Sequence, residues 1–441
     1  MPSIPQLPQL SQFPTFTQML IVTIFLLGYL AIVFEKALKL NKTASALLTG
    51  VLCWTVYMFS HDAAMVNSRL FEHLAEISGI LFFLLGAMTI VELIDAHDGF
   101  EIITSRITTL SRKKLLLIVS LLSFFLSAVL DNLTTAIVMM ALIRKLVSNA
   151  EDRMYYGGMV IIAANAGGAF SPIGDVTTTM LWVNGQITST HIILKLFFPA
   201  LISMLIPFAW MNFRMKGNFS RPEAVAEIKK NPTSARERNI VFFSGTIILL
   251  LVPVFKAVTH LPPFMGILLG LALLWTICEM IHKKKNDEQR TVFSVAGALQ
   301  RVDTQSVLFF LGILLAIAAL ESNGTLTIFA TKLESAIHSL NLRTLSIGLS
   351  SAVIDNVPLV AAVQGMYPLD IFPCDHYFWE FLAYCSGTGG SILIIGSAAG
   401  IAVMGIEEIP FGWYLKKISF PALLGYFGGA LVYIGLQAIF Q

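Results

Sequence analysis

Charged side chains are scarce in this sequence of 441 residues: 13% of them are charged, whereas 56% are hydrophobic. Ordinary soluble domains carry roughly 25% charged residues, so a soluble globular protein is excluded. Uninterrupted runs of apolar or small residues at 19–34, 43–59 and 381–406 are long enough to cross a bilayer as helices. A transmembrane barrel would instead show short segments that alternate apolar and polar residues. The composition therefore predicts an all-α polytopic membrane protein with the lipid bilayer as its surroundings.

The sequence also lacks the usual signatures of catalysis and redox chemistry. Its four cysteines are scattered, without a CxxC motif or a Cys/His cluster, so we expect no metal or redox centre at them. It contains no Walker-type Gly-Lys-Ser/Thr motif and no HExxH run, and ATP-driven pumping and hydrolysis therefore lack their usual residues. A net charge of only +2 gives no support for nucleic-acid binding. We expect no enzyme activity and no cofactor, which leaves transport driven by an ion gradient.

The apolar pattern predicts about ten spanning helices and two interrupted segments. The expected spans are 18–35, 43–60, 77–96, 156–186, 191–213, 239–258, 263–282, 306–322, 377–404 and 418–440. Segments 115–143 and 344–366 each have an Asp-Asn pair at the centre, and their arms are too short to span alone. We interpret each as a re-entrant helical hairpin that enters and leaves on the same side of the membrane.

The basic residues indicate which loops face the cytoplasm. A polar linker at 214–238 divides the chain into a first membrane half, 1–213, and a second membrane half, 239–441. With the N-terminus outside, 24 of the 29 basic residues fall in cytoplasmic loops, as the positive-inside rule requires. The linker is then cytoplasmic, both termini lie outside, and the two hairpins open to opposite sides.

The two halves are related by an internal repeat. Ser-Ala-Val-Leu-Asp-Asn at 127–132 recurs as Ser-Ala-Val-Ile-Asp-Asn at 351–356, with five of six residues identical. Glycines at 167, 168 and 174 recur in the same order at 389, 390 and 396. Because the hairpins face opposite sides, the repeats have inverted topology, with interrupted helices at 156–186 and 377–404. Transporters with this architecture bind substrate and coupling ions near the bilayer midplane.

Each hairpin tip places a carboxylate and an amide in an otherwise apolar stretch. The pairs are Asp131 with Asn132 and Asp355 with Asn356. A charged group at that depth is costly and therefore points to function. Such a carboxylate can act as an oxygen ligand for sodium or carry a proton, so the two ions would compete for the same group. That competition is itself an exchange mechanism.

Further candidate ligands lie near the break in the first crossing helix. Glycines and a proline before Asp175 free backbone groups and start a second half-helix. Asp175 is therefore a third candidate acid, with Thr177 and Thr178 as hydroxyl ligands; the alternative is that it merely caps the half-helix. Ser127 and Ser351, one turn before each tip acid, are candidates whose alternative role is hydrogen bonding between helices.

Four other titratable residues are weaker candidates. Glu92, Asp95 and Glu321 fall near the ends of spans, where water lowers the cost of their charge. His97 is expected in a loop, where it would more often be a bystander than a pH sensor.

Taken together, these motifs resemble the NhaD family of sodium/proton antiporters, within the ion transporter superfamily. The resemblance covers most of the chain and is strongest at 127–135, 165–178 and 351–358. It implies export of sodium or lithium in exchange for protons across the bacterial inner membrane. The site residues that it implies are Ser127, Asp131, Asn132, Asn165, Asp175, Thr177, Thr178, Ser351, Asp355, Asn356, Ser386 and Ser391, with sodium at Asp131, Asp175 and Asp355.

The superfamily resemblance also implies a homodimer and an elevator-like movement of the hairpin domain. Arsenite exporters and sodium-coupled dicarboxylate symporters of the same superfamily are alternatives, since fold alone does not fix the substrate. Dicarboxylate carriers place neutral tips at their hairpins, whereas both tips here are acidic, which favours a cation. Arsenite export is the closer competitor. An uncoupled channel or sensor is the alternative from another class, and it would dissipate gradients.

Overall fold

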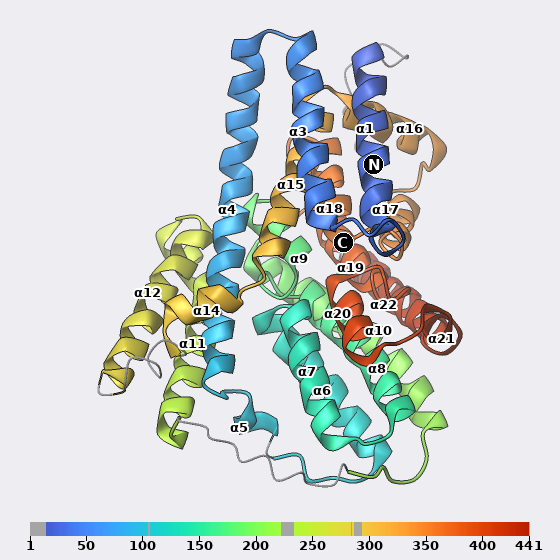
Figure 1. The fold of residues 1–441 in the computed structure, drawn as a ribbon. Helices are drawn as coiled ribbons and strands as arrows, with labels where there is room; N and C mark the ends of the chain where they lie inside the picture. The colour runs from blue at the N-terminus through green and yellow to red at the C-terminus, as the bar shows by residue number, and fades with distance from the viewer. Residues whose placement is uncertain (1–14, 105, 222–232, 284, 286–292, 441) are drawn as a thin grey trace.

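The structure is a computed structural model that describes all residues except 1–14, 105, 222–232, 284, 286–292 and 441. The described residues form helices joined by short connections (Figure 1), and they contain no strand beyond an isolated bridge between Ser111 and Asn218. Eight of these helices are long and apolar enough to cross a membrane. Arg112–Leu130 is one of them, so the expectation that both arms of segment 115–143 are too short to span alone is wrong for the first arm. The predicted all-α polytopic membrane fold is confirmed.

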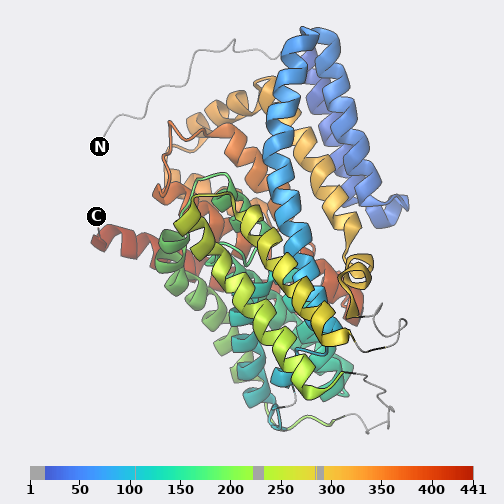
Figure 2. The same cartoon turned by 90° about the vertical axis from the view of Figure 1, so that its left-hand side faces the viewer.

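Long helices from both halves pack together in a group that does not include the hairpins or the crossing helices. α4 is the longest, at 34 residues, and begins where the Asp62 side chain accepts hydrogen bonds from two backbone N–H groups. α3 packs along α15, and α11 and α12 lie beside α4 (Figure 2). The members are α1 (Phe16–Val33), α3 (Lys42–Ser60), α4 (Ala63–Ala96), α11 (Ala235–Thr259), α12 (Pro263–His282) and α15 (Thr304–Ser322). The group thus combines three helices of the first half with three of the second.

Two helical hairpins occupy the positions of the Asp-Asn pairs. The first consists of α6 (Arg112–Leu130) and α7 (Asn132–Leu146), and the second of α17 (Leu340–Ser350) and α18 (Asn356–Met366). α7 packs on α20 of the second half, while α18 packs on α9 of the first half. Each hairpin therefore contacts the crossing helix of the opposite half as well as its own.

The crossing helices are broken at their centres. The first consists of α8 (Ala150–Ala169) and α9 (Val176–Val183), and the second of α19 (Tyr377–Gly389) and α20 (Ala398–Glu407). They are backed by α10 (Ser189–Arg214) and α22 (Ser419–Phe440), which pack against each other. The short helices are α2 (Glu35–Leu38), α5 (Glu101–Thr104), α14 (Val295–Arg301), α16 (Thr325–Ala336) and α21 (Phe411–Lys417). α9, α18 and α19 meet at the centre of the molecule (Figure 1).

Two equivalent glycines let each hairpin pack closely on its crossing helix. A Cβ atom at Gly167 would clash with the backbone of Phe124 in α6, and a Cβ atom at Gly389 would clash with the backbone of Gly348 in α17. Only glycine permits such close backbone approach. The sequence repeat thus corresponds to the same contact in both halves.

Candidate cation-binding site

The three predicted acids lie at the N-termini of three helices. Asp131 precedes α7, Asp175 precedes α9 and Asp355 precedes α18. Each carboxylate accepts a hydrogen bond from a backbone N–H in the first turn, at 2.8, 2.9 and 3.1 Å respectively. The positive end of a helix dipole favours negative charge. The helix N-termini therefore offset part of the free-energy cost of placing three carboxylates within the membrane.

Asp175 is the point where the two hairpin tips meet. Its side chain is buried, with 1% of its surface exposed. Asn132 of the first tip donates to its Oδ2 at 2.8 Å, and Asn356 of the second tip lies 3.4 Å from the same oxygen. The backbone N–H and hydroxyl of Thr177 both donate to Oδ1, at 2.9 and 2.8 Å. Asp175 therefore caps α9 and also connects the two halves, so the two roles weighed from the sequence are not exclusive.

Asn165 of α8 extends this network into the second half. Its Oδ1 accepts a hydrogen bond from Asn132 at 3.0 Å. Its Nδ2 donates to the hydroxyls of Ser391 and Ser397, both at 2.9 Å. All four side chains are buried. The break in the second crossing helix thus supplies hydroxyls, and no acid, to the network around Asp175.

The remaining predicted serines bond to backbone carbonyls. Ser127 donates to the carbonyl oxygen of Ala164 at 2.6 Å, and Ser351 donates to that of Ser386 at 2.8 Å, which is the equivalent contact in the other half. The hydroxyl of Ser386 itself donates to Leu382 within its own helix. The hydroxyls of Ser127 and Ser351 hold the hairpins against the crossing helices, and none of the three hydroxyls bonds to Asp175.

Thr178 is the predicted site residue whose hydroxyl forms no hydrogen bond with the described residues. Its Oγ1 is buried and has no hydrogen-bond partner among the described residues, as is also true of Thr135 Oγ1 in α7. Buried hydroxyls without a partner are uncommon in proteins. Both threonines lie in the first turn of helices that begin at site acids.

Asp131 bonds to its own helix and lies beside a cavity. Both of its carboxylate oxygens accept hydrogen bonds from Thr134, one from the backbone N–H and one from the hydroxyl, each at 2.8 Å. Its backbone has φ 113° and ψ 161°, a conformation that costs a non-glycine residue roughly 1–3 kcal/mol. Thr134 lines a cavity of about 380 Å³, together with Glu92 and Asp95. Glu92 is 3.4 Å from Arg301 in this cavity.

Asp355 faces a second cavity. Its backbone N–H donates to the hydroxyl of Tyr29 in α1 at 3.1 Å. Asp355, Tyr29 and Lys42 line a cavity of about 270 Å³, and Lys42 also lines the cavity beside the first hairpin. Asp355 thus lines one cavity, Thr134 of the first hairpin lines the adjoining one, and Asp175 is enclosed between the tips.

Sequence reasoning missed three residues of this arrangement. Ser397 follows the last repeated glycine and stands at the position equivalent to Asp175, so the repeat could have identified it. Thr134 follows Asp131 by three residues, and an Asp three residues before a Thr at a helix start is a recognisable capping pattern. Nothing in the sequence links Tyr29 to Asp355, because 326 residues separate them.

His97 lies in the turn that follows α4, as expected, but it is buried and paired, which the sequence did not indicate. His97 has no exposed surface, and its Nε2 lies 2.8 Å from Nε2 of His282 at the end of α12. The two rings stack with centroids 5.0 Å apart, and Phe293 packs against both. His97 follows the last residue of α4 directly, and this turn of the chain is packed inside the protein.

An all-helical membrane chain with two hairpins whose tips meet at one buried carboxylate defines a secondary transporter. A family model described as citrate transporter matches residues 29–380. The chain belongs to this transporter family and, within it, to the group that contains the NhaD antiporters.

Three relatives document this membership. "Sodium/proton antiporter 1" of Arabidopsis thaliana is 47% identical over 94% of this chain and 72% of its own length. "Sodium/proton antiporter 2" of the same plant is 44% identical over 94% of this chain and 98% of its own. "Na(+)/H(+) antiporter NhaD" of Alkalimonas amylolytica is 32% identical over 95% of this chain and 90% of its own. The resemblance identified from the motifs is confirmed.

Proposed function

We propose that this chain is a sodium/proton antiporter that exports sodium or lithium in exchange for protons. The observation that carries the proposal is the convergence of Asn132 and Asn356, one from each hairpin tip, on the buried carboxylate of Asp175. The names of the plant and bacterial relatives support the same exchange. Exchange of two ions leaves both ions chemically unchanged and requires only that a proton bind to and leave a carboxylate, so we infer a non-enzymatic protein that needs no cofactor.

The exchange rests on competition for the site carboxylates. A protonated acid is neutral and suits a dry site, whereas a deprotonated acid there requires a cation or several donors. Asn132 and Asn356 can serve both conditions, because an amide offers N–H donors to a carboxylate or a carbonyl oxygen to a cation. Carboxylate, amide and hydroxyl oxygens are the ligands that hard cations prefer. We assign sodium to Asp131, Asp175 and Asp355, with Asn165, Thr177, Thr178 and Ser391 completing the polar surroundings.

Two adjoining cavities, which share Lys42 and Ile401 in their linings, give access to this site. One lies beside Thr134 and the other beside Asp355 and Tyr29. Because each hairpin tip contributes an asparagine to Asp175, movement of the hairpins together with the crossing helices would carry the whole site across the membrane. This is the elevator-like movement that the superfamily resemblance implies.

We further propose an orientation, a membrane and an assembly. The distribution of basic residues places both termini outside and the 214–238 linker in the cytoplasm. The bacterial relatives favour the inner membrane, and the superfamily fold favours a homodimer. Cysteine labelling of Lys283→Cys from the cytoplasmic side only, and a dimer mass in detergent by light scattering, are the results expected.

Arsenite export, dicarboxylate symport and an uncoupled channel make different predictions in one experiment, in which dicarboxylate symport predicts no dequenching by sodium or lithium alone. Everted vesicles that contain the protein are energised, and a fluorescent pH probe is followed while sodium, lithium, potassium or arsenite is added. Sodium-dependent and lithium-dependent dequenching, absent from vesicles without the protein, is expected across a pH series. Dequenching by arsenite alone would replace the cation assignment, and collapse of the gradient without any added cation would indicate a channel.

A further inference from the structure

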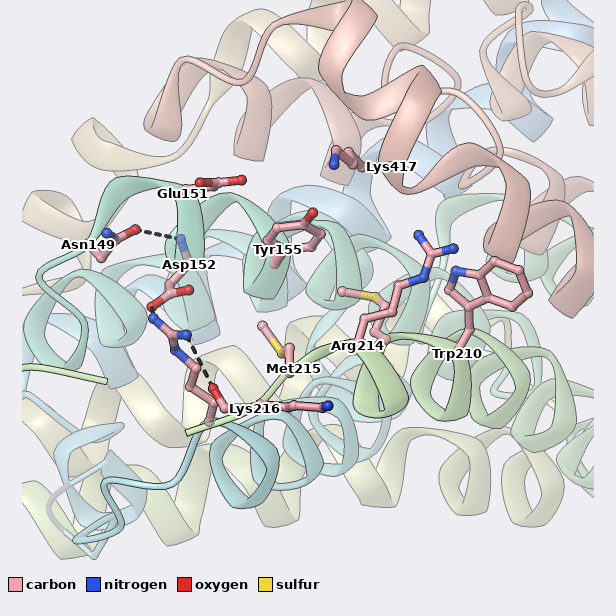
Figure 3. Close-up of a pocket in the computed structure, with 11 residues that line it drawn as sticks. Asn149, Glu151, Asp152, Tyr155, Trp210, Arg214, Met215, Lys216 and Lys417 are labelled. Carbon is pink, nitrogen blue, oxygen red and sulfur yellow. Dashed lines mark hydrogen bonds and ion pairs between the residues drawn. The ribbon is translucent and has the colours of Figure 1, made fainter. Parts of the chain in front are cut away.

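A cavity of about 260 Å³ lies away from the cation site. It is lined by residues at the starts of α6 and α8 and at the ends of α10 and α21. Figure 3 shows Lys216 and Lys417 on opposite sides of this cavity, with Arg214 between them. The segments that form it are those to which the charge map assigns a cytoplasmic position. We call it the basic cavity.

The basic cavity has more cationic than anionic side chains, and most of its cations are not in ion pairs with described residues. Arg112 is held by Asp152 at 2.7 Å, so these two charges compensate each other. Arg214, Lys216 and Lys417 form no ion pair with any described residue, and Glu151 is the one other acid that lines the cavity. The basic cavity therefore has an excess of two positive charges. Three side chains that repel one another gain from an anion placed between them.

The aromatic side chains place the basic cavity at the edge of the membrane. Arg214 is the last residue of the apolar helix α10, and its guanidinium lies over the ring of Trp210, 4.7 Å from the centroid. Tyr155 lines the same cavity. Trp and Tyr gather at the level of lipid headgroups, where one end of the ring is in lipid and the other in water. Basic pockets between membrane helices on the cytoplasmic side fit anionic headgroups.

We propose that the basic cavity binds a phosphate group, with Arg214, Lys216 and Lys417 as its cationic ligands. The position favours the phosphodiester of an anionic phospholipid as the source, and free phosphate from solution is the other source with the same chemistry. Arg214 suits two phosphate oxygens with its planar fork, while the two lysines act as point charges. This site is independent of the cation site and of the exchange proposed there.

The test compares two double variants of the purified full chain. Lys216→Gln with Lys417→Gln removes two exposed cations of the basic cavity, and Lys195→Gln with Lys332→Gln removes two cations elsewhere. Native mass spectrometry measures retention of phosphatidylglycerol and of phosphatidylcholine, and calorimetry measures binding of inorganic phosphate. Thermal unfolding of both variants establishes that they fold equally well.

We expect the cavity variant to bind phosphatidylglycerol about tenfold more weakly than the wild-type protein, because each basic residue near an anionic headgroup strengthens binding of the lipid. The control variant should match the wild-type protein, and phosphatidylcholine should be unaffected. Loss of inorganic phosphate binding alone would support the site with free phosphate as its source. Equal binding of both ligands by the two variants, or no binding of either ligand by the wild-type protein, would overturn the proposal.

Discussion

Asn356 Nδ2 of the second hairpin lies 3.4 Å from Asp175 Oδ2 in the first crossing helix, 181 residues away in the sequence. Asn132 of the first hairpin donates to the same oxygen at 2.8 Å. The acid that carries this contact is absent from the second crossing helix, where Ser397 stands instead. The two halves thus build one site that is asymmetric in charge.

The tip acids should be indispensable. Asp131→Asn and Asp355→Asn each keep the size of the side chain but remove the negative charge that competes for sodium and protons. We expect sodium-dependent dequenching to disappear in everted vesicles for both variants. Glu321→Gln, which removes an exposed acid at the end of α15, should retain most activity and serves as the control. Full activity of Asp131→Asn would remove that residue from the mechanism.

The two tip asparagines should contribute unequally. A hydrogen bond to a charged group is worth about 1.5–3 kcal/mol, and the contact of Asn132 with Asp175 is shorter than that of Asn356. Asn132→Ala should therefore raise the sodium concentration for half-maximal exchange by roughly ten- to a hundredfold. Asn356→Ala should raise it less. The reverse order, measured by vesicle titration, would contradict the geometry of the site.

The close approach of hairpins and crossing helices should not tolerate a methyl group. Gly167→Ala and Gly389→Ala would each force backbone atoms apart, and overpacking of this kind costs about 1–3 kcal/mol. Both variants should unfold at lower temperature in detergent than the wild-type protein. Gly405→Ala, where no atom lies within 4 Å of the new Cβ, is the matched control and should unfold as the wild-type protein does.

The histidine pair should make stability depend on pH. Burial lowers the pKa of His97 from its ordinary value of 6.5; the hydrogen bond to the Leu93 carbonyl and Glu237 oppose this effect, and Lys285 and Arg301 add to it. His97 Nδ1 contacts the carbonyl of Leu93, so its proton lies there and Nε2 accepts from His282. Protonation would place two N–H groups face to face.

The sign of this dependence follows from the lowered pKa. The stabilisation is complete above pH 6.5, where His97 is neutral in both states, and it is lost as the pH falls through the folded-state pKa. The unfolding temperature of the wild-type protein should drop between pH 7 and pH 5. His97→Gln should be less stable at pH 7 and should lose less on acidification. An equal drop in both proteins would show that other groups cause it.

Much of the site could be predicted because its chemistry is unusual for a membrane segment. Asp131, Asp175 and Asp355 are conspicuous as acids in apolar runs, and Gly167 and Gly389 mark the repeat. The partners of these residues could not be predicted, because hydrogen bonds such as those made by Tyr29 and Ser397 depend on packing between distant segments. The positive φ of Asp131 also has no signature in the sequence.

His97 illustrates a different limit. Its position after an apolar run correctly predicts a turn, since α4 ends at Ala96, but hydrophobicity gives no indication of what the turn packs against. The structure buries His97 against His282 of α12, 185 residues away. A hydrophobicity pattern describes each segment separately, so it cannot predict that two polar residues of different helices will pair.

The most direct test of competition at the site is proton release on sodium binding. Purified protein in weakly buffered detergent is mixed with sodium chloride or choline chloride, and the change in pH is recorded. The account predicts a saturable acidification with sodium alone, and none in the Asp175→Asn protein. Acidification by Asp175→Asn with the sodium dependence of the wild-type protein would contradict the central claim that sodium and protons compete at this carboxylate.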